Sequence, residues 1–127
     1  MNGKPICIDF DGTCVTHDYP DIGHDIGAFP VLKRLQAKGH KLILFTMRSG
    51  KELEYAVQCL ALEGIELYGV NRNPSQDSWT KSPKAYGALY IDDAALGTPL
   101  IFDRAMSDRP FVDWKEVEKL LEQRGWL

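Results

Sequence analysis

CIDFDGTC (residues 7–14) carries two aspartates two positions apart, directly after an apolar run and directly before a glycine. The segment PICIDF (5–10) is short, apolar and β-branched, which is typical of a buried strand. Side chains at positions i and i+2 of a strand lie on the same side. We therefore expect Asp9 and Asp11 to face one crevice at the end of this strand. Gly12 lets the chain turn away and lets its backbone approach a ligand such as phosphate closely.

Beyond this strand, predicted helices alternate with predicted strands. Helical spacing of apolar residues predicts three helices, at 28–39, 49–64 and 112–125. Asp113 is the expected N-cap of the last helix. Apolar runs predict further strands, at 41–45, 66–70, 88–92 and 98–103. Such alternation indicates βαβ units with a mainly parallel sheet. We expect one α/β domain over residues 1–127, a three-layer Rossmann-like fold with helices on both faces of the sheet.

The composition is that of an ordinary globular protein, with 44% hydrophobic and 26% charged residues. The net charge of -3 gives no global attraction to nucleic acid or to an anionic membrane. The three cysteines match no zinc or redox spacing, and reduced thiols are the simplest interpretation. The sequence shows no signal-peptide pattern and no apolar run that could span a membrane. We therefore expect a cytoplasmic protein without a membrane partner.

Polar side chains follow three of the predicted strands. Asp9 and Asp11 follow the first, Thr46 follows the strand at 41–45, and the pair Asp92-Asp93 follows the strand at 88–92. The carboxyl ends of parallel strands form the ligand crevice of such a sheet. Converging carboxylates repel one another, and a hard divalent cation such as Mg²⁺ relieves this repulsion. We expect a Mg²⁺ site for a phosphorylated ligand, where a carboxylate can attack phosphorus.

Other groups near these strand ends are suited to holding phosphate. Thr46 offers a hydroxyl, and the adjoining backbone at Met47 and the side chain of Arg48 offer further donors. A lysine would neutralise the remaining negative charge. Lys84 is the first choice for this role and Lys81 the second.

Taken in chain order, these motifs resemble those of the haloacid dehalogenase-like (HAD) phosphohydrolase superfamily. Its Asp-x-Asp-x-Thr motif appears as DFDGT (9–13), and its second motif, a Thr or Ser after a hydrophobic strand, appears as Thr46. Its third motif, a lysine, corresponds to Lys84, and its final acidic pair corresponds to Asp92-Asp93. The resemblance covers the chain from the first predicted strand to this pair. It implies that Thr46 and Lys84 hold the phosphoryl group.

The same resemblance implies distinct roles for the four aspartates. Asp9 would be the nucleophile and a metal ligand. Asp11 would act as general acid and then as general base, with its backbone carbonyl on the metal. Asp93 would bind the metal directly, and Asp92 would act through water. The implied enzyme is a magnesium-dependent phosphatase that works through an aspartyl phosphate.

The spacing of the motifs leaves no room for the cap domain that many members of this superfamily carry. Residues 14–45 and 47–83 must each supply a helix and a strand. We expect a capless member with a short flap at 14–27. An open crevice suits large substrates, such as a nucleic-acid end, a protein or a polysaccharide precursor. A small phosphorylated molecule or a nucleotide is an alternative substrate, and nucleic acid is expected only as substrate. Alternatively, a second copy in a homo-oligomer supplies the lid.

Two other classes of protein are compared with the hydrolase. A receiver domain also combines Asp, Thr, Lys and Mg²⁺, but its acidic pair follows the first strand and a lone acceptor Asp follows the third. Here Asp9 and Asp11 come first and the pair Asp92-Asp93 comes last, which favours the hydrolase. A non-catalytic phosphate-binding domain remains a further alternative, against which the retention of both Asp9 and Asp11 argues.

Overall fold

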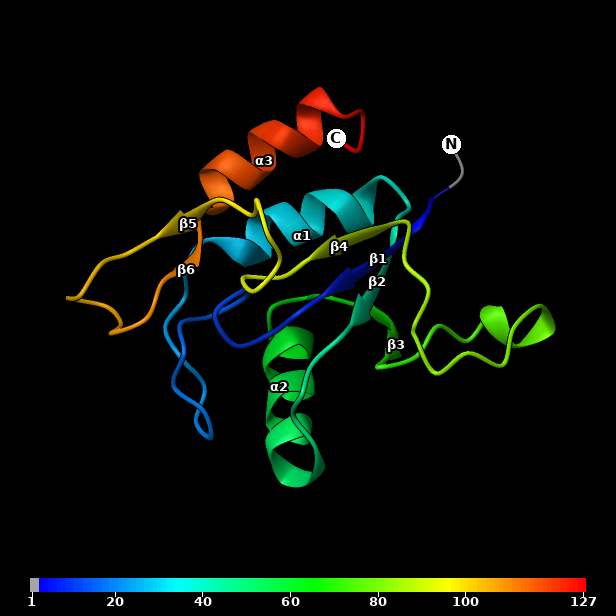
Figure 1. Cartoon of the computed structure of the whole chain (residues 1–127), viewed down its shortest axis with the longest axis horizontal. Coiled ribbons are helices and arrows are strands. Elements are labelled where there is room, and N and C mark those ends of the chain that lie inside the picture. Colours follow the sequence, from blue (N-terminus) through cyan, green and yellow to red (C-terminus); the bar gives the residue numbers. More distant parts are fainter. Residues whose placement is uncertain (1–2) are drawn as a thin grey trace.

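A parallel four-stranded sheet forms the centre of the protein in this computed structural model, which describes residues 3–127. The strand order is β3-β2-β1-β4, with bounds β1 (Pro5–Ile8), β2 (Lys41–Leu44), β3 (Leu67–Val70) and β4 (Leu89–Ile91). Three α-helices accompany the sheet (Figure 1), with bounds α1 (Ala28–Ala37), α2 (Gly50–Leu62) and α3 (Trp114–Gln123). The expected α/β Rossmann-like class is confirmed, and the described residues include no separate cap domain.

The central strands end level with one another, which determines where the polar residues meet. Ile8 of β1 is in register with Leu44 of β2 and with Ile91 of β4. The amide of Asp9 then donates to the carbonyl of Ile91 at 3.0 Å, and the amide of Phe45 donates to the carbonyl of Ile8 at 2.8 Å. The residues that follow β1, β2 and β4 therefore share one edge of the sheet.

One face of the sheet carries all three α-helices. Ile6 and Ile8 of β1 belong to one buried cluster together with side chains of α1, α2 and α3, and Figure 1 shows α1 and α3 side by side. Burial of these apolar side chains is the main source of stability. The amphipathic periodicity that predicts a helix also predicts which of its residues are buried.

The opposite face is covered differently from the expectation. Cys7 and Ile43 point to this face and pack against Ala85, which lies in the connection between β3 and β4. That connection contains only a short 3-10 helix, η1 (Gln76–Ser78). The third layer is therefore an irregular segment rather than a long helix, and Pro74 and Pro83 interrupt any helix over 71–84.

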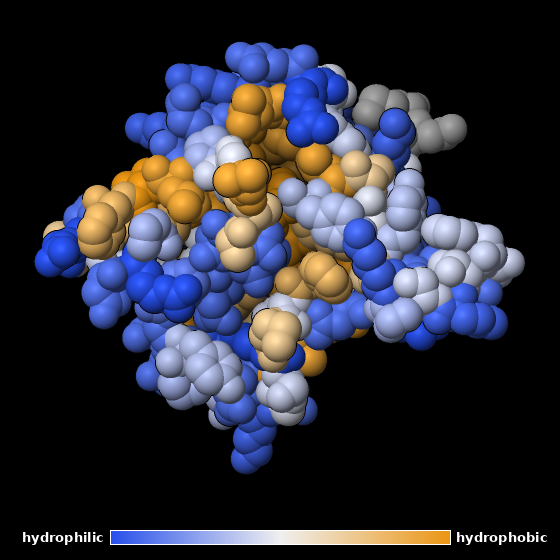
Figure 2. Space-filling view, viewed as in Figure 1, coloured by the Kyte–Doolittle hydropathy of each residue, from blue (hydrophilic) through white to orange (hydrophobic). Residues whose placement is uncertain are grey.

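A small second sheet contains the strand predicted at 98–103. β5 (Leu100–Ile101) pairs antiparallel with β6 (Phe111–Val112) instead of joining the main sheet. The amide of Val112 donates to the carbonyl of Gly12 at 2.9 Å. This hairpin therefore supports the loop that carries the first motif. Figure 2 shows apolar residues exposed around β5. Leu100 of β5 is 45% exposed, and Phe102, directly after it, is 56% exposed.

The last helix begins where the sequence predicts. The carboxylate of Asp113 accepts a hydrogen bond from the amide of Glu116 at 3.3 Å, as an N-cap does. Trp114, in the first turn, donates its indole N–H to the carbonyl of Thr13 at 2.6 Å. Among residues 3–127 no helix is both long and apolar enough to cross a membrane.

Candidate active site

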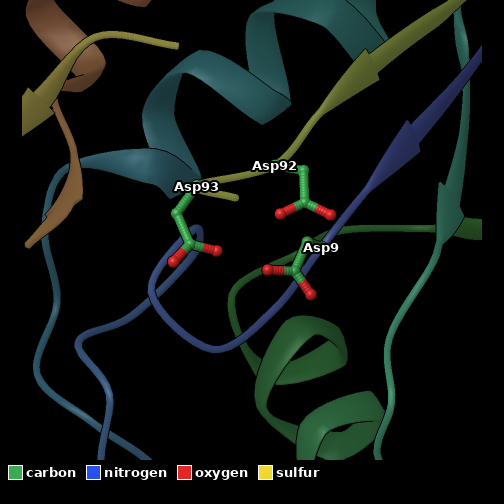
Figure 3. A group of neighbouring side chains, drawn as sticks. All are labelled: Asp9, Asp92 and Asp93. Atoms are coloured by element: carbon green, nitrogen blue, oxygen red, sulfur yellow. The ribbon is translucent and has the colours of Figure 1, made fainter. Parts of the chain in front are cut away.

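Three carboxylates meet at the carboxyl edge of the main sheet (Figure 3). Asp9 follows β1, and Asp92 and Asp93 follow β4. One carboxylate oxygen from each residue lies within 4.8 Å of the other two. This convergence is the one expected from the strand order, since β1 and β4 are neighbours in the sheet.

Strand alternation divides these carboxylates between the two faces of the sheet. Asp9 and Asp92 come two residues after Cys7 and Tyr90, so they continue the face that carries no α-helix. They line a pocket of about 220 Å³ together with Phe45 and Tyr90. A ligand on Asp9 is therefore approached from this side of the sheet.

Asp93 points toward the loop after β1. The buried hydroxyl of Thr13 accepts a hydrogen bond from the amide of Asp93 at 2.9 Å. The same hydroxyl lies 2.9 Å from Oδ2 of Asp9 and 3.2 Å from Oδ1 of Asp93. Because a hydroxyl has one proton, it donates to one of these oxygens at a time. The Thr of the first motif thus holds the two strand ends in a fixed relation.

His17 is a contact of the acidic pair that the sequence did not assign. Its Nε2 lies 2.9 Å from Oδ2 of Asp93, and it reaches the site from the 14–27 segment. A Cβ at Gly12, whose φ is +78°, would lie 2.1 Å from Nε2 of His17 and 2.7 Å from Oδ2 of Asp93. Only glycine fits this position. In the sequence, the one feature that could have pointed to His17 is its position in a polar segment close to the first motif.

Gly12 was expected to approach phosphate with its backbone, and the structure gives that backbone other partners. Its amide donates to the carbonyl of Val15 at 2.8 Å, and its carbonyl accepts from Val112. Isolated bridges join Val15 to Asp11 and to Asp25, so the 14–27 segment folds back on the motif. The role that the structure gives Gly12 is to make room for the contact between His17 and Asp93.

Asp9 is the carboxyl most affected by this environment. Burial, a hydrogen bond with Asp93 and the charge of Asp92 raise the pKa of Asp9 from 3.8 to about 8. The first cause is loss of hydration, which disfavours the charged form, and the neighbouring carboxylates add to it. A cation among the three carboxylates would reverse this effect. The site is therefore suited to a positive ion.

A pH dependence of stability follows for the metal-free protein. Below pH 3.8 Asp9 is protonated in both the folded and the unfolded states. Between pH 3.8 and about 8 the unfolded chain releases this proton while the folded protein retains it. The contribution of Asp9 to the free energy of unfolding thus falls as pH rises through this window. Thermal unfolding of the wild type and Asp9→Asn in a chelator should show a fall in Tm with rising pH that is weaker in Asp9→Asn.

Magnesium supplies the second arm of that experiment. Adding Mg²⁺ should raise the Tm of the wild type more at pH 8 than at pH 5, since protons compete with the metal at the lower pH. Parallel pH profiles of wild type and variant, with no effect of Mg²⁺, would contradict the assignment.

Asp11 is held by Arg48 in a two-pronged ion pair. Nε and Nη2 of Arg48 donate to Oδ2 and Oδ1 of Asp11, each at 2.8 Å. The Arg48 side chain is 1% exposed. Its remaining N–H groups donate to backbone carbonyls of the flap and of α2, at Pro20, Asp21 and Glu52. Arg48 therefore joins the first motif to the flap, and the ion pair raises its pKa.

These contacts leave no N–H of Arg48 free for the phosphate that it was expected to bind. A guanidinium has five N–H donors, and all five are used within the protein. The Met47 side chain is 98% exposed and contributes no fixed contact at the strand end. The amide of Thr46 donates to Oδ1 of Asn71 at 2.7 Å, and its hydroxyl accepts from the amide of Arg48. Of the Thr46 donors, the hydroxyl proton is the one left for a ligand.

The two candidate lysines lie in different surroundings. Nζ of Lys84 is 5.4 Å from the ring centroid of Tyr90, and Tyr90 lines the same pocket as Asp9. Nζ of Lys81 lies 3.5 Å from the carbonyl of Asp77, four residues earlier in the same loop. The geometry favours Lys84 as the lysine beside the site.

Comparisons with known proteins give one informative result. No family model matches the chain, and no curated protein matches it. A solved structure, described as that of a conserved protein coded by a locus from Bacteroides thetaiotaomicron, is similar over 97% of this chain and 93% of that chain. The two are 33% identical, with a TM-score of 0.78. The chain therefore belongs to the same family as this conserved protein from Bacteroides thetaiotaomicron.

Proposed function

We propose that the protein is a magnesium-dependent phosphatase that hydrolyses a phosphomonoester through an aspartyl phosphate. The observation that carries this proposal is the meeting of Asp9, Asp92 and Asp93, with one oxygen of each within 4.8 Å of the others. The order of the motifs along the chain, DxDxT first and the acidic pair last, supports a hydrolase.

Mg²⁺ fits the residues present. All three side chains offer hard carboxylate oxygens, which this ion prefers. Burial first, and then the neighbouring carboxylates, raise the pKa of Asp9, so its charged form is disfavoured without a cation. Asp9, Asp93 and the backbone carbonyl of Asp11 would hold the ion, with Asp92 acting through water. When bound, Mg²⁺ would neutralise the carboxylates and the phosphate oxygens.

In this proposal Asp9 attacks phosphorus, the P–O bond to the leaving group breaks, and water then hydrolyses the acyl phosphate. Asp11 would protonate the leaving oxygen and later take a proton from that water. Both Asp11 oxygens accept hydrogen bonds from Arg48 in the structure. The acid-base role therefore requires that Asp11 leave this ion pair, at least in part, during turnover. Lys84 and the Thr46 hydroxyl would bind the phosphoryl oxygens.

A generic aryl phosphate tests this proposal. With Mg²⁺, the purified protein should release many equivalents of the phenol product per chain. This activity should disappear when the metal is chelated and return when Mg²⁺ is added back. No turnover over a broad pH range, or phosphorylation that stops at one equivalent per chain, would instead support a receiver-like or non-catalytic domain.

We further propose that the protein acts in the cytoplasm on a phosphorylated small molecule or macromolecular end. Cys7, Cys14 and Cys59 are free thiols, as is usual in a reducing compartment. A homo-oligomer could use the exposed apolar residues around β5, among them Leu100 and Phe102.

A further inference from the structure

A second pocket adjoins the one that contains Asp9. It has a volume of about 320 Å³ and is lined by the aromatic residues Trp79, Tyr86 and Tyr90 together with Lys84. Tyr90 also lines the pocket of Asp9 and Asp92. The two pockets therefore meet at one side chain, on the face of the sheet that carries no α-helix.

Two of the aromatic side chains that line this pocket are exposed. Trp79 is 64% exposed and Tyr86 is 43% exposed. Their rings meet edge to face, with centroids 5.6 Å apart and planes at 84°. Large aromatic residues gain most when they are buried against another surface. Trp79 and Tyr86 are exposed beside a candidate active site, which indicates a surface that binds a ligand.

The segment that carries these rings is held in place by buried amide side chains. Oε1 of Gln76, a residue only 6% exposed, accepts from the amide of Tyr86 at 2.7 Å, and its Nε2 donates to the carbonyl of Lys84 at 2.9 Å. Asn73, also buried, donates to the carbonyl of Tyr86 at 2.9 Å. The surface is therefore ordered before any ligand arrives, which lowers the entropic cost of binding.

Tyr90 connects this surface to the carboxylates. Its hydroxyl donates to the carbonyl of Ala85 at 2.7 Å and accepts from the amide of Gly87 at 3.0 Å. Its ring lies 6.1 Å from that of Phe45 and 5.4 Å from Nζ of Lys84. A ligand whose phosphate lies at Asp9 thus has a cation and two pairs of aromatic rings, Phe45–Tyr90 and Trp79–Tyr86, along this face.

We propose that the second pocket binds the base of a nucleotide whose phosphate is placed at Asp9. This rests on the proposed phosphatase function and narrows its substrate class to nucleotides. Aromatic side chains stack on the π-face of any nucleobase, whereas a sugar phosphate without a base offers them no planar partner. Lys84, which lines the second pocket with its Nζ 5.4 Å from the Tyr90 ring centroid, would contact the phosphate oxygens. Trp79 and Tyr86 are specificity residues in this assignment.

Binding measured without turnover tests the assignment. Isothermal titration calorimetry of the Asp9→Asn variant in Mg²⁺ would measure the dissociation constants of AMP and of ribose phosphate, which has the same phosphate and sugar but no base. AMP should bind about tenfold or more tightly than ribose phosphate, since stacking on an aromatic side chain typically provides this much. Adding Trp79→Ala should remove most of the difference. Tyr86→Ala is a second variant that should also reduce the difference. Tyr55→Ala, which removes an exposed tyrosine of α2, is the matched control and should leave the difference unchanged.

The outcomes separate this inference from the function on which it rests. Equal affinities for AMP and ribose phosphate, or an AMP affinity that Trp79→Ala and Tyr86→Ala leave unchanged, overturn the base pocket even if the wild type hydrolyses aryl phosphates. Binding of adenosine, which has the base but no phosphate, would be measured as well. Adenosine binding that is lost in Trp79→Ala supports the pocket even if catalysis fails, and no binding of AMP or adenosine overturns it.

Discussion

Asp9→Asn should lower Mg²⁺-dependent turnover of an aryl phosphate by at least about a thousandfold, as expected when a catalytic nucleophile is removed. An amide oxygen has nearly the same shape as the carboxylate oxygen but attacks phosphorus poorly. The substitution also removes one of the three carboxyl groups whose oxygens lie within 4.8 Å of one another. The measurement is steady-state release of the aryl alcohol at saturating Mg²⁺.

The loss of activity in Asp9→Asn is not expected to come from unfolding. Since the folded environment disfavours the charged form of Asp9, the neutral variant should have an equal or higher Tm than the metal-free wild type at pH 8. Asp108→Asn changes an exposed residue of the β5–β6 hairpin. It is the matched control and should keep full activity. Full activity in Asp9→Asn would show that another group attacks phosphorus.

Arg48→Ala should lower the free energy of unfolding by about 3 kcal/mol or more, because it breaks a buried ion pair and leaves one partner uncompensated. Asp11, 18% exposed, would lose the donors to both of its oxygens. The carbonyls of Pro20 and Asp21 would also lose their donor, so the flap should loosen as well. Urea unfolding followed by circular dichroism measures the change.

Arg34→Ala provides the comparison for Arg48. Arg34 also pairs with carboxylates, Glu118 and Glu122, but its side chain is 44% exposed. Exposed pairs contribute at most about 1 kcal/mol. If the two substitutions cost the same, the buried network around Arg48 does not hold the flap as described.

The parts of the site that the sequence predicted are those determined by strand ends. A strand of apolar residues, the parallel arrangement and the rule that strand ends share an edge are enough to bring Asp9 near Asp92 and Asp93. The helix starting after Asp113 was equally predictable, since a cap acts over a few residues. These features depend on local pattern and on one general rule of topology.

The features that could not be predicted depend on contacts between distant segments. Arg48 was assigned to phosphate because it follows Thr46, yet its five donors are used by Asp11, the flap and α2. Backbone carbonyls of an irregular loop leave no trace in sequence pattern, so this network could not be foreseen. The position of His17 against Asp93 likewise depends on how the 14–27 segment folds back.

The arrangement of the C-terminal third shows the same limit. The apolar run at 98–103 predicts a strand, but it does not reveal whether that strand joins the edge of the main sheet or pairs with β6. β6 has two residues, which is too short for its alternation to be recognised. Pairing partners of short strands are set by tertiary packing rather than by propensity.

The central claim is that a phosphoryl group is carried by Asp9, and trapping that group tests it most directly. The wild type would be quenched in acid during turnover with Mg²⁺ and an aryl phosphate, then digested and mapped by mass spectrometry. The account predicts a phosphoryl adduct on Asp9 that hydroxylamine removes and that is absent from Asp9→Asn. Sustained turnover with the adduct on another residue, or with no adduct under any quench condition, would contradict it.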